Sequence, residues 1–321
     1  MNRKLVNIVL IVLAVAIVIV IGKDFIGGKA GKNIENPYEY NIDEFRKVDS
    51  TQIIYTEALN FPVKVHDWGG ITVSDSMIIV ATANELIKFN YSGKEILRKQ
   101  LIDTATCVTI DDNRQIWIGM RHYVVMYDLN GTLVKRWNSF GDRAVITSLA
   151  VSGENVYVAD AGNRIVHQCN TNGQILQKIG EKNEQKGISG FAIPSPYFDV
   201  AIDDGGFLWA ANTGKHTFEN YNPDGSLRTS WGVTSFKIEG FSGCCNPAHI
   251  SILDDNSFIT SEKGMPRIKI YDQHGQFIGV VAPPAAFDGS LAPDIAVDKQ
   301  HRVIALDFER QQVRIFEKKQ E

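Results

Sequence analysis

The sequence predicts an all-β fold, a six-bladed β-propeller, preceded by one N-terminal transmembrane helix. Two observations predict the propeller. Six similar segments, each a strand, a polar corner and a second strand, recur about every 40–50 residues. A second hairpin with a glycine in its turn follows in most of these units. A third observation, the almost wholly aliphatic stretch Leu5–Ile21, predicts the membrane helix.

The repeat is clearest when the first strands are aligned. The third residue of each aligned segment is β-branched, and these positions are Val73, Ile110, Val151, Ile202, Ile252 and Val297. The turns of the second hairpins contain Gly93, Gly131, Gly173, Gly225 and Gly275. Asn-Gly and Asp-Gly pairs supply the positive φ angles that tight hairpin turns require. Each unit therefore reads as four short strands, which is one propeller blade.

The sixth unit is incomplete, which indicates how the ring closes. Gln312–Phe316 is its third strand, and the chain ends before a fourth. Thr51–Leu59 reads as a strand without a blade of its own. We expect this strand to complete the last blade and so remove an open sheet edge. A seven-bladed ring is the alternative, but there is too little chain for it. The propeller is thus assigned to residues 51–321.

The N-terminal region differs from the rest. Residues 1–22 read as a signal anchor, with a cleaved signal peptide as the alternative, and residues 23–50 as a polar tether. The positive charges flanking the apolar stretch nearly balance, yet an anchor before a large β domain favours an extracytoplasmic, periplasmic location. The formal net charge of −4 and the lack of a Lys/Arg block give no reason to expect nucleic acid.

One blade carries a recognisable motif. Tyr157–Val166 runs strand, Asp160, two residues, Asn163, Arg164 and a second strand. This run resembles the NHL repeat, and the resemblance extends loosely over the other blades. It implies a six-bladed NHL-type propeller and does not imply an activity. It also implies that an acid ending the second strand, such as Asp160 or Asp307, satisfies backbone groups between blades.

Polar residues gather in two predicted rings around the channel. The residues opening the first strands are Gly70, Cys107, Ser148, Asp199, His249 and Asp294. Those ending the second strands are Thr82, Met120, Asp160, Asn212, Glu262 and Asp307. Acids and a histidine on one side of a channel suit a divalent cation, Ca²⁺ or Zn²⁺. The candidate ligands are Asp199, His249, Glu262, Asp294 and Asp307. The alternative is a purely structural role for each.

The connection between blades four and five is the sharpest local feature. Trp231–Pro247 is an insertion that contains Cys244 and Cys245, with His249 just beyond it. Adjacent cysteines form a vicinal disulfide in an oxidising compartment or hold a soft metal when reduced. A simple loop staple is the alternative. Cys107 and Cys169 are isolated, so a zinc finger is not indicated.

Charged turns complete the candidate binding face. Glu262, Lys263 and Arg267 lie on one turn, Arg121 on the corresponding turn of blade two, and Asn212 opens that of blade four. If these turns share a face, they suit a carboxylate-, phosphate- or sugar-like ligand. Ordinary solvated turn charge is the alternative.

The candidate functions follow from these features. The first is a membrane-tethered module that binds a protein partner of the cell envelope or a small polar ligand. The second is a divalent-metal-dependent propeller enzyme of lactonase or lyase type, with its site in the central channel. A third, redox function rests on Cys244 and Cys245 alone. No nucleophile elbow, HExxH motif or P-loop is present.

Overall fold

The computed structural model describes residues 7, 9–19, 42–65, 69–184 and 188–320. Two compact units are distinguished, residues 1–42 and 43–321. In the first, residues 9–19 are helical. No helix within the described residues is both long and apolar enough to cross a membrane. The predicted span Leu5–Ile21 extends beyond the described helix at both ends, and most of the predicted tether lies outside the described residues.

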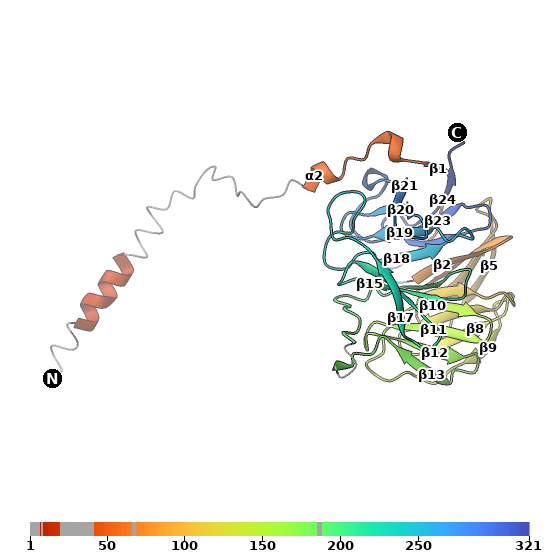
Figure 1. The fold of residues 1–321 in the computed structure, drawn as a ribbon, viewed down its shortest axis with the longest axis horizontal. Helices are drawn as coiled ribbons and strands as arrows, with labels where there is room; N and C mark the ends of the chain where they lie inside the picture. Colours follow the sequence, from red (N-terminus) through yellow and green to blue (C-terminus); the bar gives the residue numbers. More distant parts are fainter. Residues whose placement is uncertain (1–6, 8, 20–41, 66–68, 185–187, 321) are drawn as a thin grey trace. The chain divides into compact units, whose positions relative to one another are not determined.

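The second unit contains six four-stranded antiparallel sheets, as the repeat predicted (Figure 1). The helix α2 (Ile42–Phe45) spans the boundary between the units, and the 3-10 turn η1 (Ser50–Gln52) follows it. Blades one to three contain β2 (Gly69–Ser74), β3 (Met77–Thr82), β4 (Glu85–Phe89), β5 (Glu95–Gln100), β6 (Ala105–Ile110), β7 (Ile116–Met120), β8 (Val124–Tyr127), β9 (Leu133–Arg136), β10 (Ile146–Ser152), β11 (Asn155–Asp160), β12 (Ile165–Asn170) and β13 (Ile175–Ile179).

Blades four to six follow the same order. They contain β14 (Val200–Ile202), β15 (Leu208–Asn212), β16 (Thr217–Tyr221), β17 (Leu227–Trp231), β18 (His249–Ile252), β19 (Phe258–Glu262), β20 (Arg267–Tyr271), β21 (Phe277–Ala282), the 3-10 turn η3 (Pro284–Ala286), β22 (Asp294–Val297), β23 (Val303–Asp307) and β24 (Gln312–Lys318). The first strand of each blade contacts the first strands of its neighbours, so β2, β6, β10, β14, β18 and β22 form a closed ring.

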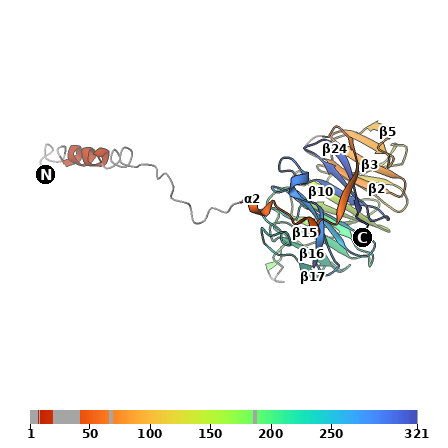
Figure 2. The same cartoon turned by 90° about the horizontal axis from the view of Figure 1, so that it is seen from above.

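The last blade is completed from the other end of the described domain. Strand β1 (Tyr55–Pro62) pairs antiparallel with β24, with Tyr55 opposite Lys318 and Pro62 opposite Gln312. Side chains of β24 share a hydrophobic cluster with those of β2 and β3, where blades six and one meet (Figure 2). Every sheet of the ring thereby has four strands.

The hydrophobic core lies between the blades. Six clusters of buried side chains each join two neighbouring sheets. The second strands are buried almost throughout, whereas the outer strands β5, β9 and β17 are mostly exposed. Turn glycines serve this packing: Gly173 has a φ of 82°, and a Cβ there would lie 2.6 Å from the Trp137 ring of the preceding blade. Such a turn requires glycine for its angle and for its space.

The strand meander places the functional candidates on one face. The first strands begin, the second strands end and the blade-to-blade loops arrive at the same end of the ring, as the pairing of His249 with Ser261 and of Asp294 with Leu306 illustrates. The insertion before β18 lies at this end, because it runs from the end of β17 to the start of β18. We call this end the loop face.

Candidate functional site

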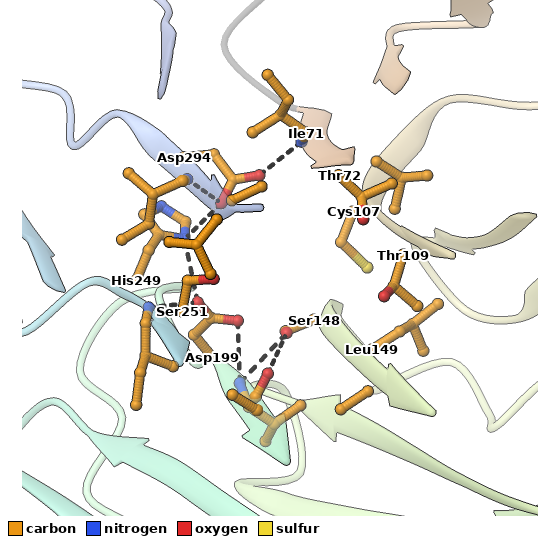
Figure 3. Close-up of a pocket in the computed structure, with 18 of the residues that line it drawn as sticks. Ile71, Thr72, Cys107, Thr109, Ser148, Leu149, Asp199, His249, Ser251 and Asp294 are labelled. Atoms are coloured by element: carbon orange, nitrogen blue, oxygen red, sulfur yellow. Dashed lines mark hydrogen bonds and ion pairs between the residues drawn. The ribbon is translucent and has the colours of Figure 1, made fainter. Parts of the chain in front are cut away.

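The central channel opens into a cavity of about 250 Å³ lined by the first strands of the blades. Asp199, His249 and Asp294 lie side by side on its wall (Figure 3). They come from the starts of consecutive first strands in blades four, five and six. One ligand atom from each residue falls within 4.8 Å of the others. Among the described residues, this is the group of acids, histidines and cysteines compact enough to hold one cation.

Backbone amides fix the two carboxylates. Asp199 accepts from the amide of Val200 (2.9 Å) through Oδ1 and from that of Ile250 (2.8 Å) through Oδ2. Asp294 accepts from Ile295 (3.0 Å) and from Ile71 (2.8 Å) in the same way. In each case one of the two amides belongs to a neighbouring blade. These bonds orient the carboxylates and leave lone pairs on their oxygens free to face the channel.

His249 lies between the carboxylates. Its Nδ1 is 3.3 Å from Asp294 Oδ1 and 3.6 Å from Asp199 Oδ2. Both distances exceed the usual length of a charge-assisted hydrogen bond, about 2.7–2.9 Å. The imidazole also packs against the Tyr197 ring, with the ring centroids 5.6 Å apart and the ring planes at 74°.

The three groups perturb one another electrostatically. Burial raises the pKa of Asp294 to about 6, with the negative charge of Asp199 adding to this effect and His249 opposing it. Burial alone would lower the pKa of His249, but the Asp294 and Asp199 carboxylates outweigh it and raise that pKa. A carboxyl group that titrates near neutral pH beside a histidine is typical of a functional site.

The rest of the first-strand ring explains why the polar cluster is one-sided. The Ser148 hydroxyl accepts from the amide of Val200 (3.2 Å), one blade further on. A Cβ at Gly70 would lie 3.1 Å from Asp294 Oδ2 and 2.9 Å from the nitrogen of Val108, so blade one has no room for a side chain there. Burial raises the pKa of the Cys107 thiol, on the opposite wall, to about 12.

The second-strand ring does not join the site. Asp307 bonds Arg314 Nη1 (3.1 Å) and the amide of Arg310 (3.0 Å). Asn212 accepts from the amide of Ala192 and donates to Glu219. The predicted metal ligand Asp307 is thus occupied inside its own blade, as Glu262 is by Arg267 and Lys269. The predicted ligand-binding residue Asn212 is fully buried. Asp160 likewise accepts from the amides of Val145 and Asn163, the structural role that the NHL resemblance implied.

A buried ion cluster in blade five accounts for Glu262 and Arg267. Arg267 is fully buried and donates to Glu262 Oε1 (2.7 Å) and Oε2 (2.9 Å), and Lys269 Nζ lies 2.8 Å from Glu262 Oε1. Arg267 and Lys269 also donate to the carbonyl of Gly240, in the insertion. The predicted ligand-binding residue Arg267 is therefore turned away from the cavity into a structural cluster.

The remaining predicted binding residues lie on the loop face. Lys263 is half-buried, and its Nζ lies 5.1 Å from the centroid of the Tyr197 ring. Cys244 and Cys245 lie on the insertion, with their Sγ atoms 3.1 Å apart. Arg121 is exposed on the turn between β7 and β8. Lys263 contacts Tyr197, which in turn contacts His249. The positive charge of Lys263 also acts on Cys244 and Cys245.

Tyr197 was not singled out from the sequence. It lies in the connection from β13 to β14, two residues before Asp199, and contacts both His249 and Lys263. The wide spacing between Val151 and Ile202, the aligned positions of the third and fourth repeats, indicates a long connection there. An aromatic residue just before the strand-opening acid in that connection was the available signal.

Comparison with known proteins identifies the fold. No family model matches the sequence, and no curated protein matches it, so the NHL resemblance stays a prediction. Virginiamycin B lyase from Staphylococcus aureus is similar in structure, with a TM-score of 0.57 and 14% identity over 82% of this chain and 99% of that one. A streptogramin B lyase structure has a TM-score of 0.58 and 12% identity over 83% and 98%.

A third similar structure is a protein of unknown function from Bacteroides thetaiotaomicron, with a TM-score of 0.56 and 11% identity over 82% of this chain and 75% of that one. Identities this low show a common fold alone. The chain is therefore a six-bladed β-propeller whose structural neighbours include the virginiamycin B lyases.

Proposed function

We propose that this propeller is a binding module that holds a divalent cation at Asp199, His249 and Asp294 and, through it, a small polar ligand in the channel. The observation that carries the proposal is the approach of three ligand atoms to within 4.8 Å on the cavity wall. Three protein ligands, drawn from imidazole and carboxylate, also match the ligand number of catalytic zinc sites, which keep a fourth position open.

The two distances from the His249 nitrogen are compatible with three ligands of one small cation. Two ligands held at about 2.0–2.1 Å from one tetrahedral ion lie about 3.4 Å apart. The His249 nitrogen lies 3.3 Å and 3.6 Å from its two carboxylate partners. Three protein ligands, one of them nitrogen, suit Zn²⁺, whereas Ca²⁺ takes about six to eight oxygens. Among the two cations predicted from the sequence, we therefore favour zinc.

The residues around the cluster have definite roles in this proposal. The amides of Ile250 and Ile71 hold the carboxylates in place, as supporting bonds do in metal sites. Tyr197 packs against His249 and restricts its ring. Lys263, above Tyr197, brings a positive charge to the loop face that suits a carboxylate- or phosphate-bearing ligand. When bound, the cation supplies Lewis acidity toward an oxygen of the ligand.

A metal-dependent lyase or lactonase is the second candidate. The raised pKa of Asp294, about 6, favours it, because a carboxyl group that titrates near neutral pH is suited to general acid–base chemistry. The lyase names of two structural neighbours agree with this candidate but belong to proteins only 12% and 14% identical. Turnover of a cyclic ester by the zinc-loaded chain, lost in His249→Ala, would distinguish an enzyme from a binding module.

The cellular setting remains part of the proposal. The aliphatic Leu5–Ile21 stretch supports a membrane tether, with the propeller on the extracytoplasmic, periplasmic side. A protein partner in the cell envelope fits such a tethered module. Capture of that partner by metal-free protein would favour a scaffold whose channel plays no part.

Zinc titration of the metal-free chain tests the proposal. We expect one zinc ion per chain by calorimetry and elemental analysis. His249→Ala and Asp199→Asn each remove a ligand, so the affinity should fall by more than the roughly 10–100-fold typical of losing a supporting residue. His301→Ala is the matched control, because His301 pairs with Asp254 at 2.6 Å on the surface. Absence of stoichiometric zinc, or unchanged affinity in both site variants, would refute the cation site.

A further inference from the structure

The adjacent cysteines of the insertion form a pair of unequal thiols. All four cysteines of the chain are free, and the Sγ atoms of Cys244 and Cys245 are 3.1 Å apart. Cys244 is exposed, whereas Cys245 is 1% exposed. The other two thiols, Cys107 and Cys169, are buried in the blades. A disulfide-bearing molecule can therefore reach Cys244 first, and Cys245 is the one thiol within bonding reach of it.

The pair sits on a fixed platform. The Asn246 side chain, 1% exposed, donates to the carbonyls of Ser242 (2.6 Å) and Lys263 (3.0 Å) and accepts from the amide of Lys263 (2.9 Å). These bonds tie the residue after the pair to the turn between β19 and β20. Upstream, Arg267 and Lys269 hold the carbonyl of Gly240. The thiols are thus anchored on both sides, which keeps them at close range.

The two thiols differ in their electrostatic surroundings. The contact with Cys245 lowers the pKa of Cys244, and the positive charge of Lys263 lowers it further. Burial raises the pKa of Cys245. An exposed thiol with a lowered pKa beside a buried thiol with a raised pKa is the arrangement expected of an attacking and a resolving cysteine.

We propose that Cys244 and Cys245 form a thiol–disulfide exchange site, in which exposed Cys244 attacks a disulfide substrate and buried Cys245 resolves the mixed disulfide. The Cys244 thiolate bonds to one sulfur of the substrate, the substrate S–S bond breaks, and the other sulfur leaves with the electron pair and takes up a proton. Cys245 then loses its proton and bonds to Cys244 Sγ, which displaces the second substrate thiol. The substrate gains two electrons, and the pair becomes a disulfide.

This site uses different residues from the proposed cation site. It requires neither zinc nor the carboxylates of Asp199 and Asp294, and it goes beyond the proposed binding function. A reaction with a disulfide in the presence of a chelator would establish it whether or not the channel binds a cation.

Intact-mass spectrometry of the full chain, treated with glutathione disulfide and chelator, tests the proposal. Wild type should lose two hydrogens without keeping an adduct, and peptide mapping should place the new bond between residues 244 and 245. Cys245→Ser should accumulate one glutathione on Cys244. Cys244→Ser should form less adduct by at least about tenfold, because its remaining thiols are buried. Cys169→Ser, at a buried position in blade three, is the matched control and should behave as wild type.

Two results would overturn the exchange site. One is a wild-type chain in which both thiols stay free after treatment. The other is equal adduct formation in Cys244→Ser and Cys245→Ser. Circular dichroism of each variant reports folding, and Cys245→Ala provides a second resolving-cysteine variant if the serine disturbs the buried position. The peptide map of wild type decides the question without any variant.

Discussion

The carboxylates of Asp199 and Asp294 combine two tasks that usually fall to different residues. Each accepts a hydrogen bond from a backbone amide of a neighbouring blade, and each lies next to His249 on the channel wall. Burial of both side chains, together with their closeness, disfavours the simultaneous ionisation of the two acids. The raised pKa of Asp294, about 6, records that cost.

The cost of ionising Asp294 should also make the stability of the metal-free protein depend on pH. The pKa of Asp294 rises from 3.8 to about 6, so the folded chain binds more protons than the unfolded chain between these values. The stabilising contribution of this group is complete below about pH 4 and is lost as the pH rises through about 6. At about 1.4 kcal/mol per pKa unit, the loss is on the order of 2–3 kcal/mol. The raised pKa of His249 acts in the same direction.

Chemical denaturation across pH 4–7, in the presence of chelator, measures this effect. The free energy of unfolding of wild type should fall relative to that of Asp294→Asn, which cannot ionise. Asp112→Asn, at an exposed position on the turn between β6 and β7, should instead run parallel to wild type. A constant difference between wild type and Asp294→Asn over this range would contradict the assigned pKa.

At the scale of elements, the insertion between β17 and β18 is attached to blade five by buried charge. Arg267 and Lys269 reach it from β20, and the Tyr271 hydroxyl donates to the carbonyl of Glu239 (3.0 Å). Burial lowers the pKa of Lys269 to about 8, although Glu262 opposes this shift. These three side chains lie at alternate positions on one side of β20. A loop that they hold together behaves as part of the blade.

Arg267→Ala should therefore damage both the blade and the insertion. Glu262 would keep one buried partner in place of two, and removing one member of a buried ion cluster costs about 3–5 kcal/mol. We expect that loss in the free energy of unfolding, together with faster proteolysis between residues 232 and 248. Arg98→Ala is the matched control: Arg98 also contacts two acids, Glu85 and Glu95, but its side chain is 39% exposed. Its loss should cost about 0–1 kcal/mol.

A comparable loss of unfolding free energy in Arg98→Ala and Arg267→Ala would show that the buried ion cluster does not anchor the insertion. An unchanged cleavage pattern in the insertion would show the same. The same measurement bears on the thiol pair, because Arg267 holds the insertion upstream of Cys244. Loosening it should slow the resolution step without removing either cysteine.

At the scale of the whole molecule, strand β1 joins the two ends of the ring. Tyr55 packs in the cluster between blades five and six, and Phe61 in that between blades six and one. Glu57 pairs with Arg314 of β24, which is 2% exposed. Strand β1 thus contributes to both interfaces of the last blade as well as to its sheet.

Two truncations separate the tether from this closure. Deletion of residues 1–48 leaves β1 intact, so the melting temperature should stay that of the full chain. Deletion of residues 1–62 removes β1, opens the edge of β24 and strips both clusters. It should lower the melting temperature by more than about 10 °C, at about 2–4 °C per kcal/mol, or cause aggregation through the open edge. Equal melting temperatures for the two truncations would refute a closing role for β1.

The fold was accessible from the sequence because each blade repeats a local pattern. The strand period, the turn glycines and the unpaired strand near residue 55 are all written in short stretches of chain. The three-residue cluster was only partly accessible: Asp199, His249 and Asp294 share an aligned position, but so do Glu262 and Asp307 in the second ring. Some of these acids pair with buried arginines instead, as Glu262 does with Arg267 and Asp307 with Arg314. No local sequence pattern specifies which way those arginine side chains point. The role of Tyr197 depends on how an insertion folds back over the channel.

Ser148, Asp199 and Asp294 each accept a hydrogen bond from a backbone amide of the next blade, and the three bonds run the same way around the ring. A substitution that alters the ligands of the channel therefore also loosens a seam between blades. Each substitution selected for a new activity at this wall, in nature or in the laboratory, would therefore also lower the stability of the fold. Variation among relatives of this protein should therefore collect in the loops that make no such bonds, while the wall itself changes slowly.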